Sequence, residues 1–253
     1  GLETYGEDPY LSGLLGTAFV KGMQGDHDKY LKTAACAKHY VVHSGPEAER
    51  HTFNATPPIQ DFYQTYLPAF EELVREGDVE AIMCAYNRTY DEPCCGSTFL
   101  LEEILRERWG FSGHILTDCG ALTDFHKTHK VTDTPAESAA KAIKSGVNLN
   151  CGGTMTALGE AIEQGLITES ELDERLGTLL RSRFELGLFD PAEMNPYNEI
   201  GTEVLRSEKH VNLAREAAAK STVLLKNDGT LPLEKNIQHL FVIGPLANKG
   251  DVL

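Results

Sequence analysis

Positive charge is scarce in this 253-residue sequence, which has 23 Lys and Arg residues against 38 Asp and Glu residues and a formal net charge of −15. A surface of this sign repels phosphate backbones, which argues against a nucleic-acid-binding protein. Long apolar runs are also missing, because no stretch approaches the roughly 20 apolar residues that a membrane helix needs. We therefore expect neither a nucleic-acid partner nor a membrane span, whereas a neutral, hydroxyl-rich substrate is compatible with this charge.

An initiator Met and a secretory signal are both absent, and because the sequence opens at Gly1 we expect its true beginning to lie upstream. Hydrophobic residues make up 41% of the chain, which is enough to form a core. The length fits one large domain, or part of a barrel joined to another unit.

Paired CxxC spacing is missing among the six cysteines, and they are too dispersed for a small disulfide scaffold. We expect most of them to be small core hydrophobes. Cys119 and Cys151 differ, because each ends a strand-like run. If the two strands are neighbours about 4.8 Å apart, the two Cα atoms fall within disulfide range. Such a bridge would suit an oxidising compartment; the alternative is two free thiols.

Short β-prone runs alternate with amphipathic helical stretches over the first 186 residues. Strands are predicted at residues 33–42, 79–86, 113–118 and 147–151. Helices are predicted at residues 10–23, 60–76, 98–109, 135–144, 156–164 and 168–186, the last capped by Thr168 and followed by Gly187. This alternation indicates βαβ units with a parallel sheet, although four strands are too few to close an eight-stranded barrel.

The alternation stops where Asp190-Pro191 and Asn195-Pro196 indicate a linker. Beyond it we expect a helix over residues 207–221, an extended segment over 222–226 and a buried strand over 239–244. The sequence therefore divides into a barrel part at residues 1–189, a linker and helix at 190–235, and the start of a second domain at 236–253.

Polar residues stand at the ends of all four predicted strands: Lys38-His39-Tyr40, Tyr86-Asn87, Asp118-Cys119 and 148–151. The carboxyl ends of parallel strands meet at one edge, where an α/β barrel assembles its active site. A carboxylate, an ammonium, an imidazole and a phenol together suit a hydroxyl-rich substrate. Each also has a structural alternative: Asp118 as a helix cap, Lys38 as a surface charge, His39 as a core histidine and Tyr86 as barrel packing.

Six runs carry a resemblance that covers essentially the whole chain: GLETYGEDPYL, KHYVVHSGPEAERH, IMCAYN, WGFSGHILTDCGA, SGVNLNCG and AREAAAKSTVLLKNDGTLPL. In this order they resemble glycoside hydrolase family 3. The resemblance implies the C-terminal part of a (β/α)8 TIM-like barrel, a linker and the start of an α/β sandwich domain. Members are mostly exo-acting β-glucosidases and β-xylosidases that retain anomeric configuration, and neither a cofactor nor a metal is implied.

The resemblance also implies roles by position. Asp118 matches the nucleophile that forms a glycosyl-enzyme. Lys38 and His39 match the pair that holds hydroxyls of the non-reducing-end sugar, Arg50 resembles a further sugar contact, and Tyr86 resembles the tyrosine beside the nucleophile. A cationic Lys38 would favour the ionised form of the nucleophile, which is the form that attacks.

Cys119 departs from the pattern of many glucosidases of this family, which have a Trp directly after the nucleophile. Together with the SGPEAERH loop, this substitution resembles the β-xylosidase branch, so we predict a β-xylosidase, with β-glucosidase as the alternative. The smaller side chain changes the pocket near the sugar ring. We expect oligosaccharides from plants or aryl glycosides as substrates, and their breakdown would suit a secreted or periplasmic protein.

The second departure from the family pattern concerns the residue that acts as the acid. Retaining hydrolysis needs a second carboxyl group about 5 to 5.5 Å from the first. The loop at residues 43–47 lacks the His-Asp dyad of the N-acetylglucosaminidase branch. In the other branches a Glu of the second domain serves, so we expect the remainder of the parent chain to complete the barrel and supply the acid. Glu47 and Glu49 are the alternatives within this sequence.

Two rival hypotheses remain. A metal-dependent barrel hydrolase could use His39, His43, His51 and Asp118, although these three histidines lie on one strand and its trailing loop. Alternatively, the chain is a noncatalytic, sugar-binding fragment with open sheet edges.

Overall fold

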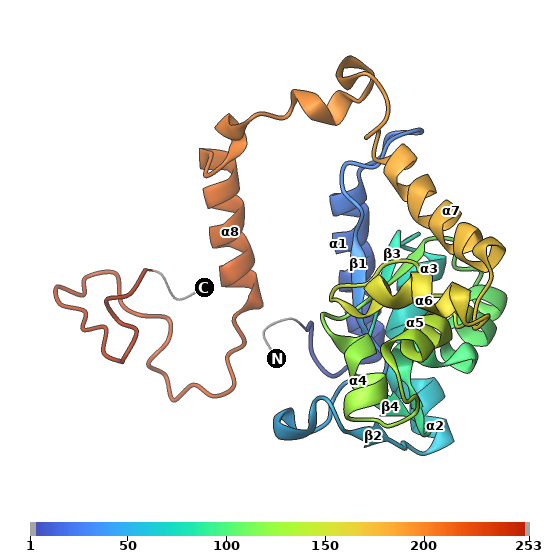
Figure 1. Cartoon of the computed structure of the whole chain (residues 1–253). Helices are drawn as coiled ribbons and strands as arrows, with labels where there is room; N and C mark the ends of the chain where they lie inside the picture. The colour runs from blue at the N-terminus through green and yellow to red at the C-terminus, as the bar shows by residue number, and fades with distance from the viewer. Residues whose placement is uncertain (1–3, 251–253) are drawn as a thin grey trace. The chain divides into compact units, whose positions relative to one another are not determined.

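The computed structural model describes residues 4–250 and divides the chain into two compact units, Gly1–Asn198 and Glu199–Leu253. The first unit contains the sheet, the core and every strand among the described residues (Figure 1). The domain boundaries expected from the sequence, at 189/190 and 235/236, stay a prediction.

A three-stranded parallel sheet forms the centre of the first unit. Its strands are β1 (Cys36–Tyr40), β3 (Ala81–Cys84) and β6 (His114–Thr117), in the order β1-β3-β6. Ala37 pairs with Ile82, and Ile82 with Ile115. The fourth predicted strand adds only one parallel bridge, between Leu116 and Leu149. The parallel pairing is as predicted, but each strand is shorter than its predicted range at both ends, because the outer residues lie in the adjoining loops.

Helices α1 (Pro9–Gln24) and α3 (Pro68–Arg75) pack against each other. Asp8 caps α1 by accepting a hydrogen bond from the Tyr10 backbone N–H at 2.9 Å. The helix predicted over residues 60–76 is divided into α2 (Ile59–Asp61), a π-helical turn η2 (Phe62–Tyr66) and α3. Pro68 explains the interruption, since proline has no backbone N–H to continue the helical ladder.

The remaining helices of the first unit follow the strands. They are η4 (Phe99–Arg108), α4 (Ala121–Lys127), α5 (Pro135–Lys144), the turn η5 (Thr154–Ala157), α6 (Leu158–Glu163) and α7 (Glu169–Glu185). Thr168 caps α7 as predicted, in a capping box with Glu171. Helix α4, directly after the third strand, was not predicted.

A second, small sheet was also missed by the sequence patterns. It joins β2 (Asn54–Ala55), β4 (Arg88–Thr89) and β5 (Glu92–Pro93), with the turns η1 (Glu47–Glu49) and η3 (Cys94–Gly96) beside it in the chain. Two-residue strands carry too little periodicity to be recognised in a sequence.

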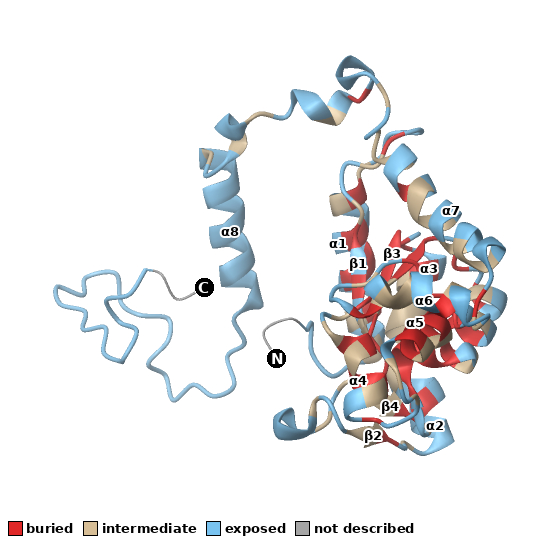
Figure 2. Cartoon of the chain, in the orientation of Figure 1, coloured by how far each residue is buried: buried red, intermediate tan, exposed pale blue. Residues whose placement is uncertain are grey.

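The core lies between the sheet and the surrounding helices, and Figure 2 shows the buried positions concentrated there. Ile82 and Ile115 of the sheet and Leu101 of η4 are fully buried. None of the helices within residues 4–250 is both long and apolar enough to cross a membrane.

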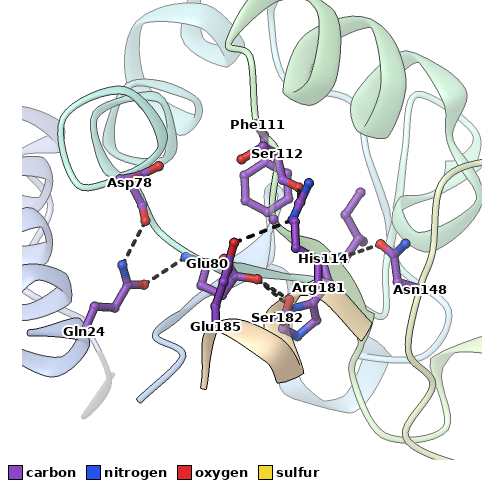
Figure 3. Close-up of polar contacts among 12 residues, drawn as sticks. Gln24, Asp78, Glu80, Phe111, Ser112, His114, Asn148, Arg181, Ser182 and Glu185 are labelled. Atoms are coloured by element: carbon purple, nitrogen blue, oxygen red, sulfur yellow. Dashed lines mark hydrogen bonds and ion pairs between the residues drawn. The ribbon is translucent and has the colours of Figure 1, made fainter. Parts of the chain in front are cut away.

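A buried polar network closes the amino ends of β3 and β6. Glu80, His114 and Ser182 point toward one another (Figure 3): the Ser182 hydroxyl donates to Glu80 Oε1, and His114 Nδ1 lies 2.9 Å from Ser182 Oγ and 3.4 Å from Glu80 Oε1. The Gln24 side chain accepts from the Glu80 backbone N–H at 2.9 Å. Helices α1 and α7 are thereby joined to the same edge of the sheet.

Residues 190–198 form the last part of the first unit. The Asp190 carboxylate accepts hydrogen bonds from Lys29 Nζ at 2.8 Å and from the Tyr30 hydroxyl at 2.5 Å. Short turns η6 (Ala192–Met194), η7 (Pro196–Glu199) and η8 (Thr202–Val204) follow.

The second unit contains α8 (Glu208–Ser221), close to the predicted range, and an irregular segment after it. The buried strand expected over residues 239–244 is not formed, and these residues are exposed. A single β-prone run cannot satisfy its backbone groups alone, and none of the other described residues pairs with it.

Candidate active site

Asp118 directly follows β6 at the carboxyl edge of the main sheet. Its backbone N–H donates to the carbonyl oxygen of Cys84 on the neighbouring strand at 3.2 Å, and its side chain is 14% exposed. One carboxylate oxygen, Oδ2, lies 3.3 Å from His39 Nε2, and the other, Oδ1, accepts from the Cys119 backbone N–H at 2.7 Å.

The alternative role for Asp118, capping the next helix, is wrong. Helix α4 has Gly120 at its N-cap, with no side-chain capping bond. Gly120 has φ +87°, a left-handed conformation that favours glycine and permits the sharp turn after Asp118. The carboxylate of Asp118 therefore remains in the site at the strand end.

His39 comes from the end of β1, two strands away from β6. Its ring lies 4.8 Å from that of His43, centroid to centroid, and His43 Nδ1 is 3.2 Å from the Asn87 side-chain oxygen. The segments at the ends of three strands therefore contribute polar groups to the carboxyl edge of the sheet, as the strand-end pattern predicts.

Tyr86 lies beside the Asp118 loop. Its hydroxyl donates to the Cys119 carbonyl oxygen at 2.8 Å. Burial and the neighbouring Asp118 carboxylate raise the pKa of Tyr86 to about 12. The phenol therefore keeps its proton near neutral pH and acts as a hydrogen-bond donor.

Arg50 reaches the same area from the loop after β1. Its guanidinium carbon lies 5.9 Å from the centre of the Tyr86 ring, and its Nη2 donates to Glu47 Oε2 at 2.8 Å. Arg50, Glu47 and His43 line a small cavity of about 130 Å³. The hydrogen bond from Arg50 lowers the pKa of Glu47.

Lys38 precedes His39 on β1. It lines a cavity of about 510 Å³ together with residues of α1 and α3, such as Phe19 and Phe70. The charge of Lys38 also acts on Cys36, although burial dominates and raises the pKa of that thiol to about 11. The imidazole of His39 lies at the Asp118 carboxylate, with 3.3 Å between Nε2 and Oδ2.

Two residues behind Tyr86, Asp124 and His129, were missed, and His51 was considered only as a metal ligand. His51 Nδ1 lies 2.7 Å from Asp124 Oδ2, and the His51 ring meets the Tyr86 ring edge to face at 4.5 Å. His129 Nε2 lies 2.8 Å from the Tyr86 carbonyl oxygen. Asp124 and His129 belong to α4 and the turn after it, so their meeting with Tyr86 depends on a helix that the sequence patterns did not reveal. Within residues 4–250, no group of three His, Cys, Asp or Glu side chains is arranged to hold a metal ion.

Two disulfides flank the site. Cys119 and Cys151 are bonded, with Cα atoms 4.4 Å apart, so the bridge considered from their neighbouring strands is formed. Cys84 and Cys95 form a second bridge with Cα atoms 5.1 Å apart. Cys84, Cys94 and Cys95 are core residues, as expected of small hydrophobes, but Cys36, Cys119 and Cys151 are exposed, and the bond between Cys84 and Cys95 was not expected. The chain folds back through β4 and β5 between Cys84 and Cys95, and their spacing alone does not reveal this.

The parallel sheet with polar groups at its carboxyl edge defines an α/β protein of the TIM-barrel type. Residues 1–182 match the family described as "Glycosyl hydrolase family 3 N terminal domain". A xylan 1,4-β-xylosidase of Xylanibacter ruminicola is 44% identical over 100% of this chain and 30% of its own length. A β-xylosidase/α-L-arabinofuranosidase 2 of Medicago sativa subsp. varia is 40% identical over 98% of this chain and 33% of its own length.

Comparison with solved structures indicates the same family. A GH3 exo-β-xylosidase (XlnD) in complex with a xylobiose aziridine activity-based probe has a TM-score of 0.88 and 32% identity, covering 94% of this chain and 32% of that one. A β-glucosidase from Listeria innocua in complex with glucose has a TM-score of 0.81 and 32% identity, covering 92% of this chain and 32% of that one.

The chain belongs to glycosyl hydrolase family 3. The predicted fold class, an α/β chain that forms part of a TIM-like barrel, is confirmed. The chain spans about a third of the length of the relatives it matches.

Proposed function

We propose that this chain carries the nucleophile of a retaining exo-β-glycosidase that releases xylose from the non-reducing end of oligosaccharides, acting as part of a longer polypeptide. The observation that carries the proposal is the Asp118 carboxylate at the end of β6, 3.3 Å from His39 and held by the Cys119 N–H. In the proposed reaction, Asp118 attacks the anomeric carbon and forms a glycosyl-enzyme, which water then hydrolyses.

The surroundings of Asp118 support this role. A nucleophilic carboxylate must be ionised, and a backbone N–H donor together with a nearby imidazole stabilises negative charge. The carboxylate is only partly exposed, so few competing waters surround it. His39 is proposed to bind a sugar hydroxyl next to the reacting carbon.

Arg50 and Lys38 are proposed as further sugar contacts. The Arg50 side chain is 38% exposed and lines the small cavity of about 130 Å³, so its guanidinium N–H groups are donors for a hydroxyl oxygen there. Lys38 precedes His39 on the same strand and lines the cavity beside α1 and α3, where its ammonium group is a donor for a hydroxyl oxygen.

The choice of xylose rests on the position after the nucleophile. Cys119 and its disulfide to Cys151 stand where many glucosidases of this family have a Trp, and they cover less of the sugar than an indole ring would. The two relatives described above are named as xylosidases. A β-glucosidase is the second candidate, supported by the likeness to the Listeria innocua enzyme in its glucose complex.

The acid is proposed to come from outside this chain. Glu47 would have to stay protonated to donate to the leaving group, but its hydrogen bond from Arg50 lowers its pKa and favours the ionised form. The Glu47 side chain is also 80% exposed, and Glu49 is exposed as well. Neither offers the apolar setting that keeps a carboxyl group protonated near neutral pH.

Trapping with a 2-fluoro-xyloside tests the nucleophile directly. The polypeptide that carries this sequence should acquire one covalent sugar, and peptide mapping should place it on Asp118. The Asp118→Asn variant, treated in parallel, should remain unlabelled. A sugar found on any other residue would contradict the assignment.

The ratio of kcat/KM for aryl β-xyloside and aryl β-glucoside tests the sugar. We expect the xyloside to be preferred, and a preference for the glucoside would favour the second candidate. Turnover by residues 1–253 alone separates an enzyme from a sugar-binding fragment. We expect almost none without the remainder of the polypeptide, and substantial turnover would show that our placement of the acid is wrong.

A further inference from the structure

The disulfide next to the candidate nucleophile differs in its surroundings from the second disulfide. Cys119 and Cys151 are both exposed, whereas Cys84 and Cys95 are fully buried. A buried bridge adds to the core, but an exposed bridge between two loops contributes no comparable packing. The exposed bridge therefore calls for a different explanation.

The backbone N–H and the carbonyl oxygen of Cys119 both form hydrogen bonds. Its N–H donates to Asp118 Oδ1 at 2.7 Å, and its carbonyl oxygen accepts from the Tyr86 hydroxyl at 2.8 Å. The orientation of the carboxylate and the position of the phenol therefore both depend on where the Cys119 backbone lies.

The segment opposite Cys119 pairs with β6 only over a short stretch. The Asn148 N–H donates to the Ile115 carbonyl at 2.8 Å and the Thr117 N–H to the Leu149 carbonyl at 3.0 Å, and Leu116 and Leu149 form a single parallel bridge. Beyond it, the Gly120 N–H donates to the Cys151 carbonyl at 2.7 Å, and the Cys151 N–H donates to Thr117 Oγ1 at 3.1 Å. The disulfide adds a covalent link where the strand pairing ends.

We infer that the Cys119–Cys151 disulfide is a positioning element of the active site: it holds the Cys119 peptide so that Oδ1 of Asp118 is bound and the carboxylate keeps its attacking orientation. This inference rests on the proposed function, because it assigns the disulfide to the same nucleophile. It predicts that loss of the bridge slows the chemical step more than it weakens substrate binding.

The test compares the wild type with the double variant Cys119→Ser/Cys151→Ser in the full polypeptide. We expect kcat for aryl β-xyloside to fall about 10- to 100-fold, since a misplacement near 1 Å can cost this much, while KM changes less than about twofold. The rate of covalent labelling by the 2-fluoro-xyloside should fall in parallel. A purely structural role would lower the thermal midpoint and leave both rates unchanged in the folded protein.

A second measurement serves if the variant does not fold. Mild treatment of the wild type with a dithiol reduces the bridge, converting Cys119 and Cys151 into thiols while the reagent becomes a cyclic disulfide. Mass mapping of alkylated thiols should find this exposed bridge open and the buried Cys84–Cys95 bridge intact. The kcat should fall on reduction and recover on reoxidation, and the folded double variant should not respond.

Two results are distinguishable. If the wild type is labelled at Asp118 and the open or substituted bridge leaves labelling and kcat unchanged, the positioning inference is overturned and the proposed function stands. If the wild type is labelled elsewhere, the proposed function itself fails, and the inference fails with it.

Discussion

The main sheet has a histidine–carboxylate pair at each end, and the two pairs have almost the same separation. At the carboxyl edge His39 and Asp118 lie 3.3 Å apart, and at the amino edge His114 and Glu80 lie 3.4 Å apart. At the amino edge, the Ser182 hydroxyl of α7 joins the pair and closes it (Figure 3).

At the carboxyl edge, loops surround the pair in place of a helix, and Asp118 is bound by a backbone N–H. The two pairs differ in which part of the chain borders them. A carboxylate closed off by a helix contributes to stability, and one bordered by loops remains accessible to a substrate, as is typical of the two ends of an α/β barrel.

The largest effect is expected from Asp118→Asn at the carboxyl edge. Loss of the proposed nucleophile should lower kcat on the order of 10⁴-fold or more, with little change in the thermal midpoint, because the amide keeps the shape of the carboxylate. Steady-state kinetics and circular dichroism measure the two quantities. Asp133→Asn, an exposed matched change, should leave both unchanged; equal losses in the two variants would contradict the role of Asp118.

Glu80→Ala should have the opposite effect at the amino edge. It leaves His114 and Ser182 buried without their shared partner, which should cost about 3 kcal/mol of unfolding free energy. Denaturant titration measures the loss, and activity well below the midpoint should be kept. Glu107→Ala on the exposed side of η4 should stay within about 0.5 kcal/mol. Similar stability for the two variants would show that the network is not needed.

Tyr86→Phe should have a smaller effect on the carboxyl edge. The substitution removes the hydrogen bond that the phenol donates to the Cys119 carbonyl. Because one neutral hydrogen bond contributes about 1 kcal/mol, kcat/KM should fall about fivefold. Tyr90→Phe is the matched control, since its hydroxyl binds the Pro57 carbonyl in another part of the unit. A loss in the control as large as that for Tyr86 would contradict a local effect.

The smallest expected effect is the pH dependence of stability that arises at the amino edge. Burial and the negative Glu80 raise the pKa of Glu185 above its ordinary 4.5. The folded protein then holds a proton that the unfolded chain releases, so this contribution is complete below about pH 4.5 and is lost as pH rises through the raised pKa. Burial alone would raise the pKa of Glu80, but hydrogen bonds with His114 and Ser182 outweigh it and lower the pKa, so its contribution is lost as pH falls below 4.5.

Glu185→Gln separates these two contributions. It should raise the thermal midpoint by about 1 °C at pH 7 and by less at pH 4, because its side chain is partly exposed and the effect is small. Thermal melts between pH 4 and 7 measure this, with the exposed Glu163→Gln as the control. A larger gain at pH 4 than at pH 7 would mean that the sign is wrong.

Local signals predicted the fold best. Thr168 and Glu171 form their capping box within four consecutive residues, and the α5 range agrees with the helix predicted over residues 135–144. The pairing of His39 with Asp118 was also within reach, because parallel strands bring their carboxyl ends together.

Contacts between distant residues were not predictable in this way. The Cys84–Cys95 bridge depends on how the chain returns through β4 and β5. The cavity that Lys38 lines could not be predicted either, because it depends on how α1 and α3 pack beside β1, and the role of Lys38 as a sugar contact stays a prediction. The contact between Glu80 and α7 also could not be predicted, because no periodic pattern in the sequence indicates it.

The bond from Ser182 to Glu80 spans 102 residues of sequence. During synthesis at about 5 to 20 residues per second, Glu80 is added to the chain roughly 5 to 20 seconds before Ser182. In that interval the polar network at the amino ends of β3 and β6 lacks the Ser182 hydroxyl. The closing of this edge of the sheet therefore depends on α7, which follows both strands in the order of synthesis.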